Sequence, residues 1–399
     1  KTTDFVTGWF ARFFDYVDQV PDAVSAFVTT NSVCQGQQAS ELWPAAFERG
    51  CEIRFAHTSF RWANLAAQNA GVTVVVIGMG KKSSQPKRLY QNDLLKQCTA
   101  IGPYLTPDSL EYTQKANKPI GEQSLMLFGN MPRDGGNLLM DTDLARKVTA
   151  EDPVAKLFIK RYVGSEELIN GKLRYCLWIE DHGSDIAKKS DFVMQRLALV
   201  AENRSSSSAE STRSFASKPH RFVQIAGTAR KASIVVPKVS SESRAYLPVG
   251  YVTADTIISD LCFALYDAPL WNMALVASGL HLVWIATVCG KLETRYRYSN
   301  TLGWNTFPVP VLTEKNKADL TRCAEDILLA REAHFPATIA ELYDPETMPD
   351  NLREAHERND EVLERIYIGR RFKNDTERLE KLFELYSEMT ANQKLRKAK

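Results

Sequence analysis

The chain has 399 residues, of which 44% are hydrophobic and 25% are charged, and its formal net charge at pH 7 is +2. This length allows two or three domains with a sizeable core, and the composition is ordinary for a soluble globular protein. A balance so close to neutral excludes a surface that is basic throughout, so a site for a polyanion has to be sought in the local charge pattern.

The first hundred residues alternate between helical and strand patterns. Val, Ile and Phe mark the strands, and "DFVTGWFARFFDYV" has the apolar spacing of an amphipathic helix. The expected elements are, in order, helix 4–18, strand 25–30, helix 37–49, strand 51–56, loop 57–71 and strand 72–79. This alternation predicts an α/β fold with a mostly parallel sheet covered by helices. Since no helix separates the last two strands, we expect them to form an antiparallel pair at the edge of the sheet.

The remaining chain divides into a mixed part and a helical part. Polar, turn-rich sequence such as "GNMPRDGGN" fills residues 81–150 and marks the entry to a second domain. Strands are expected at 172–180, 232–237 and 245–252. The charged last part has helical patterns. The domains are therefore expected at 1–105, 106–312 and 313–399.

One apolar run, "LWNMALVASGLHLVWIATVC" at 270–289, approaches the length of a membrane span. Because Asn272, Ser278 and His281 interrupt it, a buried helix is expected, and no membrane partner. The seven cysteines are scattered and never spaced C-x-x-C. This pattern argues against a disulfide framework and a structural metal site, and it favours a cytoplasmic location.

Residues 204–250 form a local basic segment, with eight Lys or Arg against two Glu. Interleaved Ser, Thr, His and Tyr can donate to phosphate oxygens, and Arg can also reach base edges. The segment therefore fits a nucleic-acid patch. From composition alone, a solvated, Ser-rich loop is the stronger alternative, above all in "RSSSSAESTRS".

Distinctive segments occur in order along nearly the whole chain. They include "AFVTTNSVCQGQQASELWPAAFERGCEIRFAHTSFRWAN", "LFGNMPRDGGNLL", "YVGSEELINGKLRYCLWI", "IVVPKVSSESRAYLPVGYV", "CGKLETRYRYSNTLGWNTFPVP" and "ELYDPETMP". In these segments the chain resembles the MmeI-like DNA enzymes, a family of combined restriction–modification proteins and methyltransferase-only relatives.

The resemblance implies a site-specific enzyme that transfers a methyl group from S-adenosyl-L-methionine to adenine N6 in double-stranded DNA, within a restriction–modification system. It assigns residues 1–105 to the C-terminal half of a Rossmann-like class I methyltransferase sheet. Residues 106–312 would be a mixed α+β target-recognition domain, and residues 313–399 a helical C-terminal region.

The chain departs from the family pattern at its start. The cofactor-binding glycine motif and the Asn-Pro-Pro-aromatic loop would lie upstream of Lys1, so we expect the chain to be inactive alone and the full-length parent to be active. The alternative function is a DNA-binding specificity module without catalysis of its own. A restriction endonuclease is less favoured because no P-D…(D/E)-x-K constellation is evident, and an RNA methyltransferase would not need this recognition domain.

An adenine inside a duplex has to be flipped out before its amino group can be methylated. The family pattern places Phe60 against the flipped base, with Trp62 in reserve; the alternative is that both rings fill the core between strand ends. Asn31 follows the first strand, where open α/β sheets bind ligands. It is expected either to line the pocket or to form a local Asx turn.

The start of the first helix is expected to border the cofactor. The resemblance implies that Asp4 lies near S-adenosyl-L-methionine and that Phe5 touches its adenine ring, whereas an N-cap role for Asp4 remains open. His57 lies beside aromatic residues and is expected to be packed rather than catalytic.

Two clusters in the recognition domain carry side chains suited to DNA. Arg pairs with guanine and Glu accepts from the cytosine amino group, although ordinary exposed strand ends remain the alternative. The candidate DNA-binding residues are Arg230, Lys231, Lys238, Ser240, Ser241, Glu242, Arg244, Tyr246, Arg295, Arg297, Tyr298 and Asn300.

Overall fold

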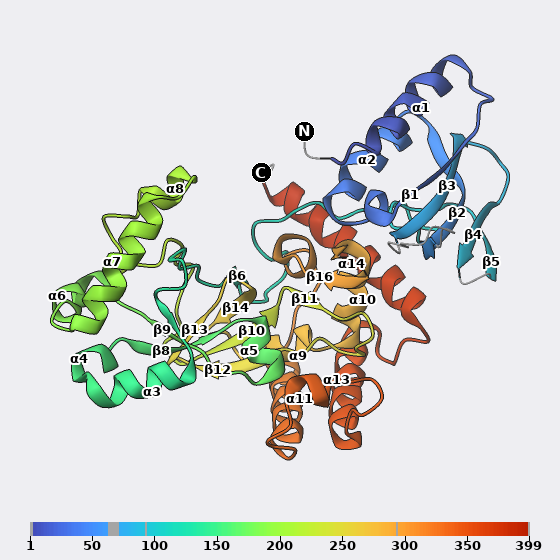
Figure 1. Ribbon diagram of the computed structural model, residues 1–399. Coiled ribbons are helices and arrows are strands. Elements are labelled where there is room, and N and C mark those ends of the chain that lie inside the picture. The colour runs from blue at the N-terminus through green and yellow to red at the C-terminus, as the bar shows by residue number, and fades with distance from the viewer. Residues whose placement is uncertain (1–2, 63–71, 92–93, 293, 398–399) are drawn as a thin grey trace.

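The computed structural model describes residues 3–62, 72–91, 94–292 and 294–397. Two lobes stand on either side of an opening, and a group of helices lies below it (Figure 1). The sheet lobe consists of α1 Thr7–Gln19, β1 Ser25–Thr30, the 3-10 helix η1 Asn31–Cys34, α2 Gly36–Glu48, β2 Cys51–Trp62, β3 Val72–Lys81, β4 Lys87–Gln91 and β5 Leu94–Cys98.

The sheet of this lobe has the strand order β1-β3-β2-β4-β5. Only β2 and β4 pair in parallel, while β1 with β3, β2 with β3, and β4 with β5 are antiparallel. The expectation of a mostly parallel sheet is therefore wrong for the paired strands. The antiparallel pairing of β2 with β3 is confirmed, but β3 lies between β1 and β2 rather than at the edge. Apolar patterns show which strands are buried but not the order or direction in which strands pair, so they could not show that β3 lies between β1 and β2.

Helices α1 and α2 cover one face of this sheet. The ring of Phe10 on α1 lies 4.7 Å from that of Phe27 on β1 and 5.8 Å from that of Trp43 on α2. The Trp43 indole also donates to the carbonyl of Val33 at 2.8 Å, which ties α2 to the turn after β1. Aromatic packing of this kind fixes the carboxyl end of β1 in place.

The middle of the chain forms three smaller sheets, with orders β12-β10-β14-β6, β11-β16-β15 and β13-β8-β9-β7. The strands are β6 Leu127–Phe128, β7 Leu139–Met140, β8 Ile159–Val163, β9 Tyr175–Leu177, β10 Ala232–Pro237, β11 Val239–Ser240, β12 Gly250–Thr253, β13 Thr256–Ile258, β14 Cys262–Tyr266, β15 Gly290–Leu292 and β16 Arg295–Arg297. The helices are α3 Thr142–Glu151, α4 Pro153–Lys156, α5 Ser165–Asn170, η2 Asp181–Gly183, α6 Ser184–Ala187, α7 Asp191–Ser205, α8 Glu210–Arg213, α9 Trp271–Val276, α10 Gly279–Val288 and the π-helical turn η3 Asn300–Trp304.

The strand predictions of this region differ in quality. The strand expected at 232–237 coincides with β10. The strand expected at 172–180 is only the short β9. Of the strand expected at 245–252, only the end belongs to β12, and mostly buried irregular chain precedes it. The apolar run 270–289 is buried as expected, but it forms α9 and α10, because Ser278 caps a new helix by accepting from the backbone N–H of His281.

The last part of the chain is helical, as expected, and consists of α11 Glu314–Glu332, α12 Ile339–Leu342, α13 Asp350–Ile368 and α14 Asp375–Lys397. Thr313 and Asn316 form a reciprocal capping box at the start of α11. Within the described ranges, no helix combines the length and the apolar character needed to cross a membrane. All seven cysteines are buried and free.

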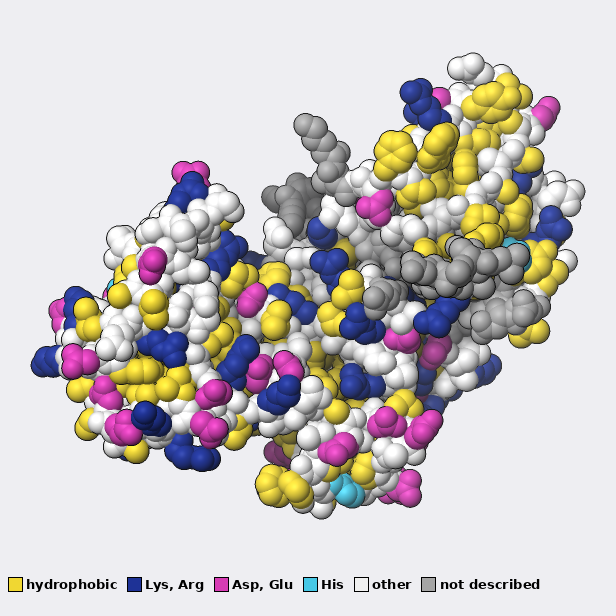
Figure 2. All heavy atoms as spheres, viewed as in Figure 1, with side chains coloured by type: hydrophobic (Ala, Val, Ile, Leu, Met, Phe, Trp, Pro, Cys, Tyr) yellow, Lys and Arg dark blue, Asp and Glu magenta, His cyan; other side chains and the backbone are white. Residues whose placement is uncertain are grey.

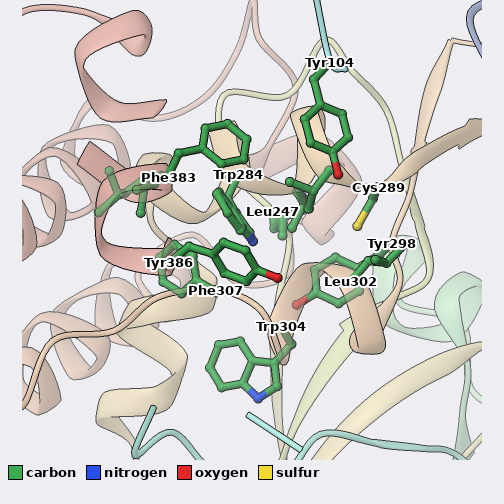
Figure 3. Packing of buried hydrophobic residues seen from close by; sticks show 14 of the residues in the cluster. Tyr104, Leu247, Trp284, Cys289, Tyr298, Leu302, Trp304, Phe307, Phe383 and Tyr386 are labelled. Atoms are coloured by element: carbon green, nitrogen blue, oxygen red, sulfur yellow. The ribbon is translucent and has the colours of Figure 1, made fainter. Parts of the chain in front are cut away.

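One hydrophobic core joins the sheet lobe, the middle region and the final helices. Trp284 of α10 packs against Phe383 and Tyr386 of α14, and Phe383 in turn stacks with Tyr104 from the segment after β5 (Figure 3). A second, separate core lies among α3, α7, β8 and β9 and includes Phe222. A third, small core of Val235, Ile258, Cys262 and Ala264 lies in the middle region. The two larger cores mark a large body and a smaller lobe, here called the arm lobe (residues 138–222 together with β13).

Candidate functional site

The carboxyl ends of β1 and β2 form a shared rim of the sheet lobe. Thr30 of β1 and Phe60 of β2 are both paired with Val74 of the intervening β3. They therefore lie at the same level, about 10 Å apart across two strand spacings, with side chains on the same face. The residues that follow these strands meet at one edge, as expected for a ligand-binding rim.

Phe60 lies on β2 rather than in a loop. The strand continues to Trp62, so the loop expected at 57–71 is wrong for 57–62, and residues 63–71 lie outside the described residues. A bulge between His57 and Phe60 shifts the register. Before it, His57 stacks on Tyr90 at 4.3 Å, in keeping with a packing role.

The Phe60 ring is 39% exposed and Trp62 is 44% exposed, with their ring centroids 6.3 Å apart. This exposure contradicts the alternative in which both rings fill the core. Two half-exposed aromatic faces at a strand end are able to stack on a planar base.

Asn31 occupies the first position after β1, in η1. Its side chain is buried, and its amide nitrogen has no hydrogen-bond partner within the structure. A buried donor left without an acceptor is costly and needs an explanation. A ligand acceptor at the rim would supply the partner, which favours a pocket role over a purely local turn.

Asp4 does not cap α1, since the cap position is Val6 and no side chain caps the helix. Its carboxylate instead accepts from Ser32 at 3.1 Å and from Gln38 at 2.6 Å, which joins the chain before α1 to the turn after β1. Phe5 is 88% exposed beside it. The structure thus brings Asp4 close to the Asn31 turn and leaves the Phe5 ring open to a flat ligand.

The two predicted DNA clusters meet in one small sheet, here called the recognition sheet (β11, β15 and β16). Val239 pairs with Arg297, and Ser240 pairs with Tyr296. Arg295 and Arg297 are exposed, while Tyr296 between them is half-buried. The side chains of β16 therefore alternate between solvent and the interior.

Lys238 stands at the start of this sheet, above two aromatic rings. Its ammonium lies 4.4 Å from the centroid of Phe128 and 5.3 Å from that of Phe263. Burial lowers the pKa of the Lys238 ammonium. With Arg297 and Lys115 it lines a groove of about 810 Å³, which therefore has a cationic wall.

The turn after β11 approaches the rim of the sheet lobe. A hydrogen bond from Thr294 holds the pKa of the Glu242 carboxyl below its usual range, and the charges of Lys291 and Arg61 add to that effect. Arg61 follows Phe60 on β2 and its side chain points to the opposite face of the strand, so the Glu242 turn lies near this end of β2 rather than against the Phe60 ring. Ser241 is bonded to Ser243 at 2.8 Å within the turn.

Four candidates are buried, which contradicts a direct DNA contact in this conformation. Tyr246 donates to Asp360 at 3.2 Å, and Tyr298 is hydrogen-bonded to His281 at 2.9 Å. The Asn300 amide donates to the carbonyl of Met126, and Ser240 is buried within its strand. Aromatic and amide side chains are ambiguous in sequence because they suit cores and interfaces alike.

Arg230 and Lys231 lie apart from the recognition sheet. Their backbone N–H groups donate to Asp267 at 2.8 and 2.7 Å before β10, while Lys238 follows the same strand. Seven residues of extended chain separate Lys231 from Lys238 by about 20 Å. The side chains of Arg230 and Lys231 are exposed. Arg244 is half-buried, and desolvation lowers the pKa of its guanidinium.

Sequence reasoning missed Arg61, Lys115 and Lys291. Each is an isolated cation outside the basic segment, and only tertiary structure brings it to the site. Figure 2 shows a broad hollow between the two lobes with Lys and Arg side chains along its floor. Among the described residues, no group of His, Cys, Asp and Glu is arranged to hold a metal ion.

Comparisons with known proteins give concordant matches along the chain. The family model of the MmeI DNA-methyltransferase domain matches residues 1–91, that of the MmeI target recognition domain matches 109–311, and that of the MmeI C-terminal domain matches 311–394. DNA methyltransferase A of Bacillus subtilis (strain 168) is 40% identical over 391 residues, which are 98% of this chain and 44% of that protein.

A solved structure also matches nearly the whole chain. The type IIL restriction-modification enzyme MmeI in complex with DNA superposes with a TM-score of 0.89 at 34% identity, covering 98% of this chain and 53% of that one. The chain thus spans about half the length of the proteins that it matches.

Proposed function

Because the chain belongs to the MmeI family, we propose that it is part of a site-specific DNA methyltransferase that acts on adenine N6 in double-stranded DNA. The observation that carries this proposal is the position of the recognition sheet beside the rim. The Glu242 turn lies close enough to the end of β2 for the charge of Arg61 to lower the pKa of Glu242, and Phe60 presents an exposed ring on the other face of the same strand end. One surface would read bases while the adjoining one holds a flipped base.

The residues at the rim fit S-adenosyl-L-methionine, which would supply the methyl group. Phe5 presents an exposed ring suited to the adenine face, beside Asp4. The unpartnered amide nitrogen of Asn31 is a donor for an acceptor on either the cofactor or the flipped base. Phe60 would hold the target adenine by stacking.

The exposed and half-buried side chains of the recognition sheet, of Lys238 before it and of the turn after β11 are the proposed base readers and phosphate contacts. They are Lys238, Ser241, Glu242, Arg244, Arg295 and Arg297, with Arg230 and Lys231 as more distant phosphate contacts. The buried Ser240, Tyr246, Tyr298 and Asn300 would support these positions from beneath.

Duplex DNA binding is the direct test. We expect the chain to bind duplex DNA more tightly than single-stranded DNA or RNA, with affinity that falls as salt rises. The double variant Lys238→Ala/Arg297→Ala should bind at least about tenfold more weakly. Arg358→Ala is the matched control, because this exposed arginine on α13 is paired with Asp326. Equal affinity for unrelated RNA, or unchanged binding by the double variant, would contradict the proposal.

Catalysis is tested separately. We propose that this chain binds DNA without transferring a methyl group, and that a longer parent protein carrying it methylates adenine. The measurement is transfer of a labelled methyl group by both forms, followed by nucleoside analysis of the DNA. Methylated cytosine in place of N6-methyladenine would sink the adenine assignment while leaving DNA binding intact.

A further inference from the structure

A buried arginine joins two loops at the far end of the arm lobe. Arg204, in the last turn of α7, is 0% exposed. Its guanidinium donates to the carbonyls of Pro132 and Arg133 at 2.8 and 3.0 Å. It also donates to those of Phe215, Lys218 and Arg221 at 3.2, 2.9 and 2.7 Å.

The Arg204 cation thus holds backbone carbonyls in place and does not neutralise a carboxylate. Within the described part of the chain, no carboxylate forms an ion pair with Arg204. The planar fork of a guanidinium can hold several carbonyls in a fixed arrangement, which an ammonium cannot reproduce. Arg204 therefore fixes the loop around residue 133 against the loop that contains α8.

The first loop carries local strain. Arg133 has φ 45°, in the left-handed region that residues with a Cβ rarely adopt. The loop also packs tightly on α7, because a Cβ added at Gly135 would come within 2.6 Å of the Asn203 side chain. Strain of this kind persists where surrounding contacts impose it, and it is frequent at functional sites.

The strained loop presents an exposed arginine next to hydroxyl groups. Arg133 donates to Ser211 at 3.2 Å and to Thr212 at 3.1 Å. Close by in the second loop, Arg213 donates to the carbonyls of Ser207 and Ser208 at 2.8 and 2.7 Å. Among the described residues, neither guanidinium has a carboxylate within ion-pair distance.

Arg221 provides the contrast, since it pairs with Asp181 at 2.8 Å. Arg133 and Arg213 form no such ion pair among the described residues, and each retains N–H groups for a further acceptor. Arginine with Ser and Thr hydroxyls is the combination that binds phosphate oxygens. Figure 1 places α8 at the tip of the arm lobe, across the opening from α1 and α2.

We propose that Arg133 and Arg213 form a phosphate-binding arm that contacts the backbone of duplex DNA outside the base pairs read by the recognition sheet. Arg204 is its positioning residue. This inference rests on the proposed DNA-binding function and adds a second contact to it. It also gives three arginines of the basic segment different roles: Arg204 is buried and organises the loops, Arg221 is paired with Asp181, and Arg213 joins Arg133 in binding phosphate.

The test compares two duplexes that share the preferred sequence. One is trimmed to the segment that the chain protects, and the other extends about one helical turn (~10 base pairs) on each side. We expect Arg133→Ala/Arg213→Ala to weaken binding to the extended duplex about tenfold and to lower the salt slope by about 2, while binding to the trimmed duplex is unchanged. Arg133→Lys/Arg213→Lys should recover most of the loss.

Positioning by Arg204 has its own readout. Arg204→Lys keeps the charge but not the fork, and should lower the salt slope on the extended duplex as the double alanine variant does. Retention of the full slope would overturn the positioning role. If the wild-type chain binds both duplexes and the double alanine variant matches it, the arm is refuted alone. If the wild-type chain binds neither, the proposed function falls with it.

Discussion

At the scale of single residues, the most telling positions are those where burial and chemistry disagree. Asn31 buries a donor without a partner, and Phe60 leaves an aromatic face in solvent. Both lie at the rim of one sheet. Their residue types were visible in the sequence, but exposure and satisfaction of hydrogen bonds depend on neighbours that are distant along the chain.

Phe60→Ala tests the stacking role in the parent protein. Loss of a stacked base contact costs about 1–3 kcal/mol, so methyl transfer should fall by about ten- to hundredfold. Phe60→Trp should retain most activity. Leu94→Ala is the control, because it removes an apolar side chain that is exposed to solvent on the outer strand β5, away from the rim. An unchanged rate for Phe60→Ala would remove this ring from the base pocket.

Asp360 gives a pH-dependent prediction for stability. Burial raises the pKa of this carboxyl to about 6, although it accepts hydrogen bonds from the Gly279 N–H and the Tyr246 hydroxyl. The folded chain therefore binds a proton more tightly than the unfolded chain. The contribution of Asp360 to the free energy of unfolding should be fully present below about pH 4 and fall by up to about 3 kcal/mol as the pH rises through 6.

The measurement is urea unfolding at a series of pH values for wild type and Asp360→Asn. The difference between the two curves isolates this carboxyl. A variant that cannot ionise should lack the decline between pH 4 and pH 7. A parallel decline in both proteins would show that other groups cause it.

At the scale of helices and strands, the sequence predicted where the elements lie along the chain better than how the strands are ordered within the sheets. The elements α1, α2, β1, β3 and β10 lie within a few residues of their expected bounds, because strong apolar periodicity and local turn signals define them. The insertion of β3 between β1 and β2 could not be foreseen from that periodicity. Nor could the joining of the two arginine-containing clusters, which are more than forty residues apart in the chain, into one sheet.

Strand β10 separates two groups of proposed DNA contacts, and this makes a prediction. Replacing Arg230 and Lys231 by alanine should weaken binding evenly across DNA sequences, as expected for phosphate contacts at one end of the strand. Replacing Glu242 and Arg297, near its other end, should change which bases are preferred. Selection from a randomised duplex library reads out both effects. Equal changes in preference for the two double variants would contradict this division.

At the scale of the whole molecule, the two larger hydrophobic cores predict two unfolding units. The large core joins the sheet lobe to α10 and α14, whereas the arm lobe has its own core around Phe222. Phe222→Ala should destabilise the arm lobe by about 3–5 kcal/mol and leave the large body protected. Hydrogen exchange followed by mass spectrometry would show faster exchange within the arm lobe alone. An equal increase in the sheet lobe would mean that the molecule opens as one unit.

The alternation along β16 has a consequence for how such proteins diversify. Arg295 and Arg297 project outward, while Tyr298 and Asn300 hold the following chain to the interior. Anchoring and the proposed base reading thus fall on different residues of the same short stretch. Substitution of the outward residues alone would then change the DNA target, while the buried residues preserve the fold beneath them.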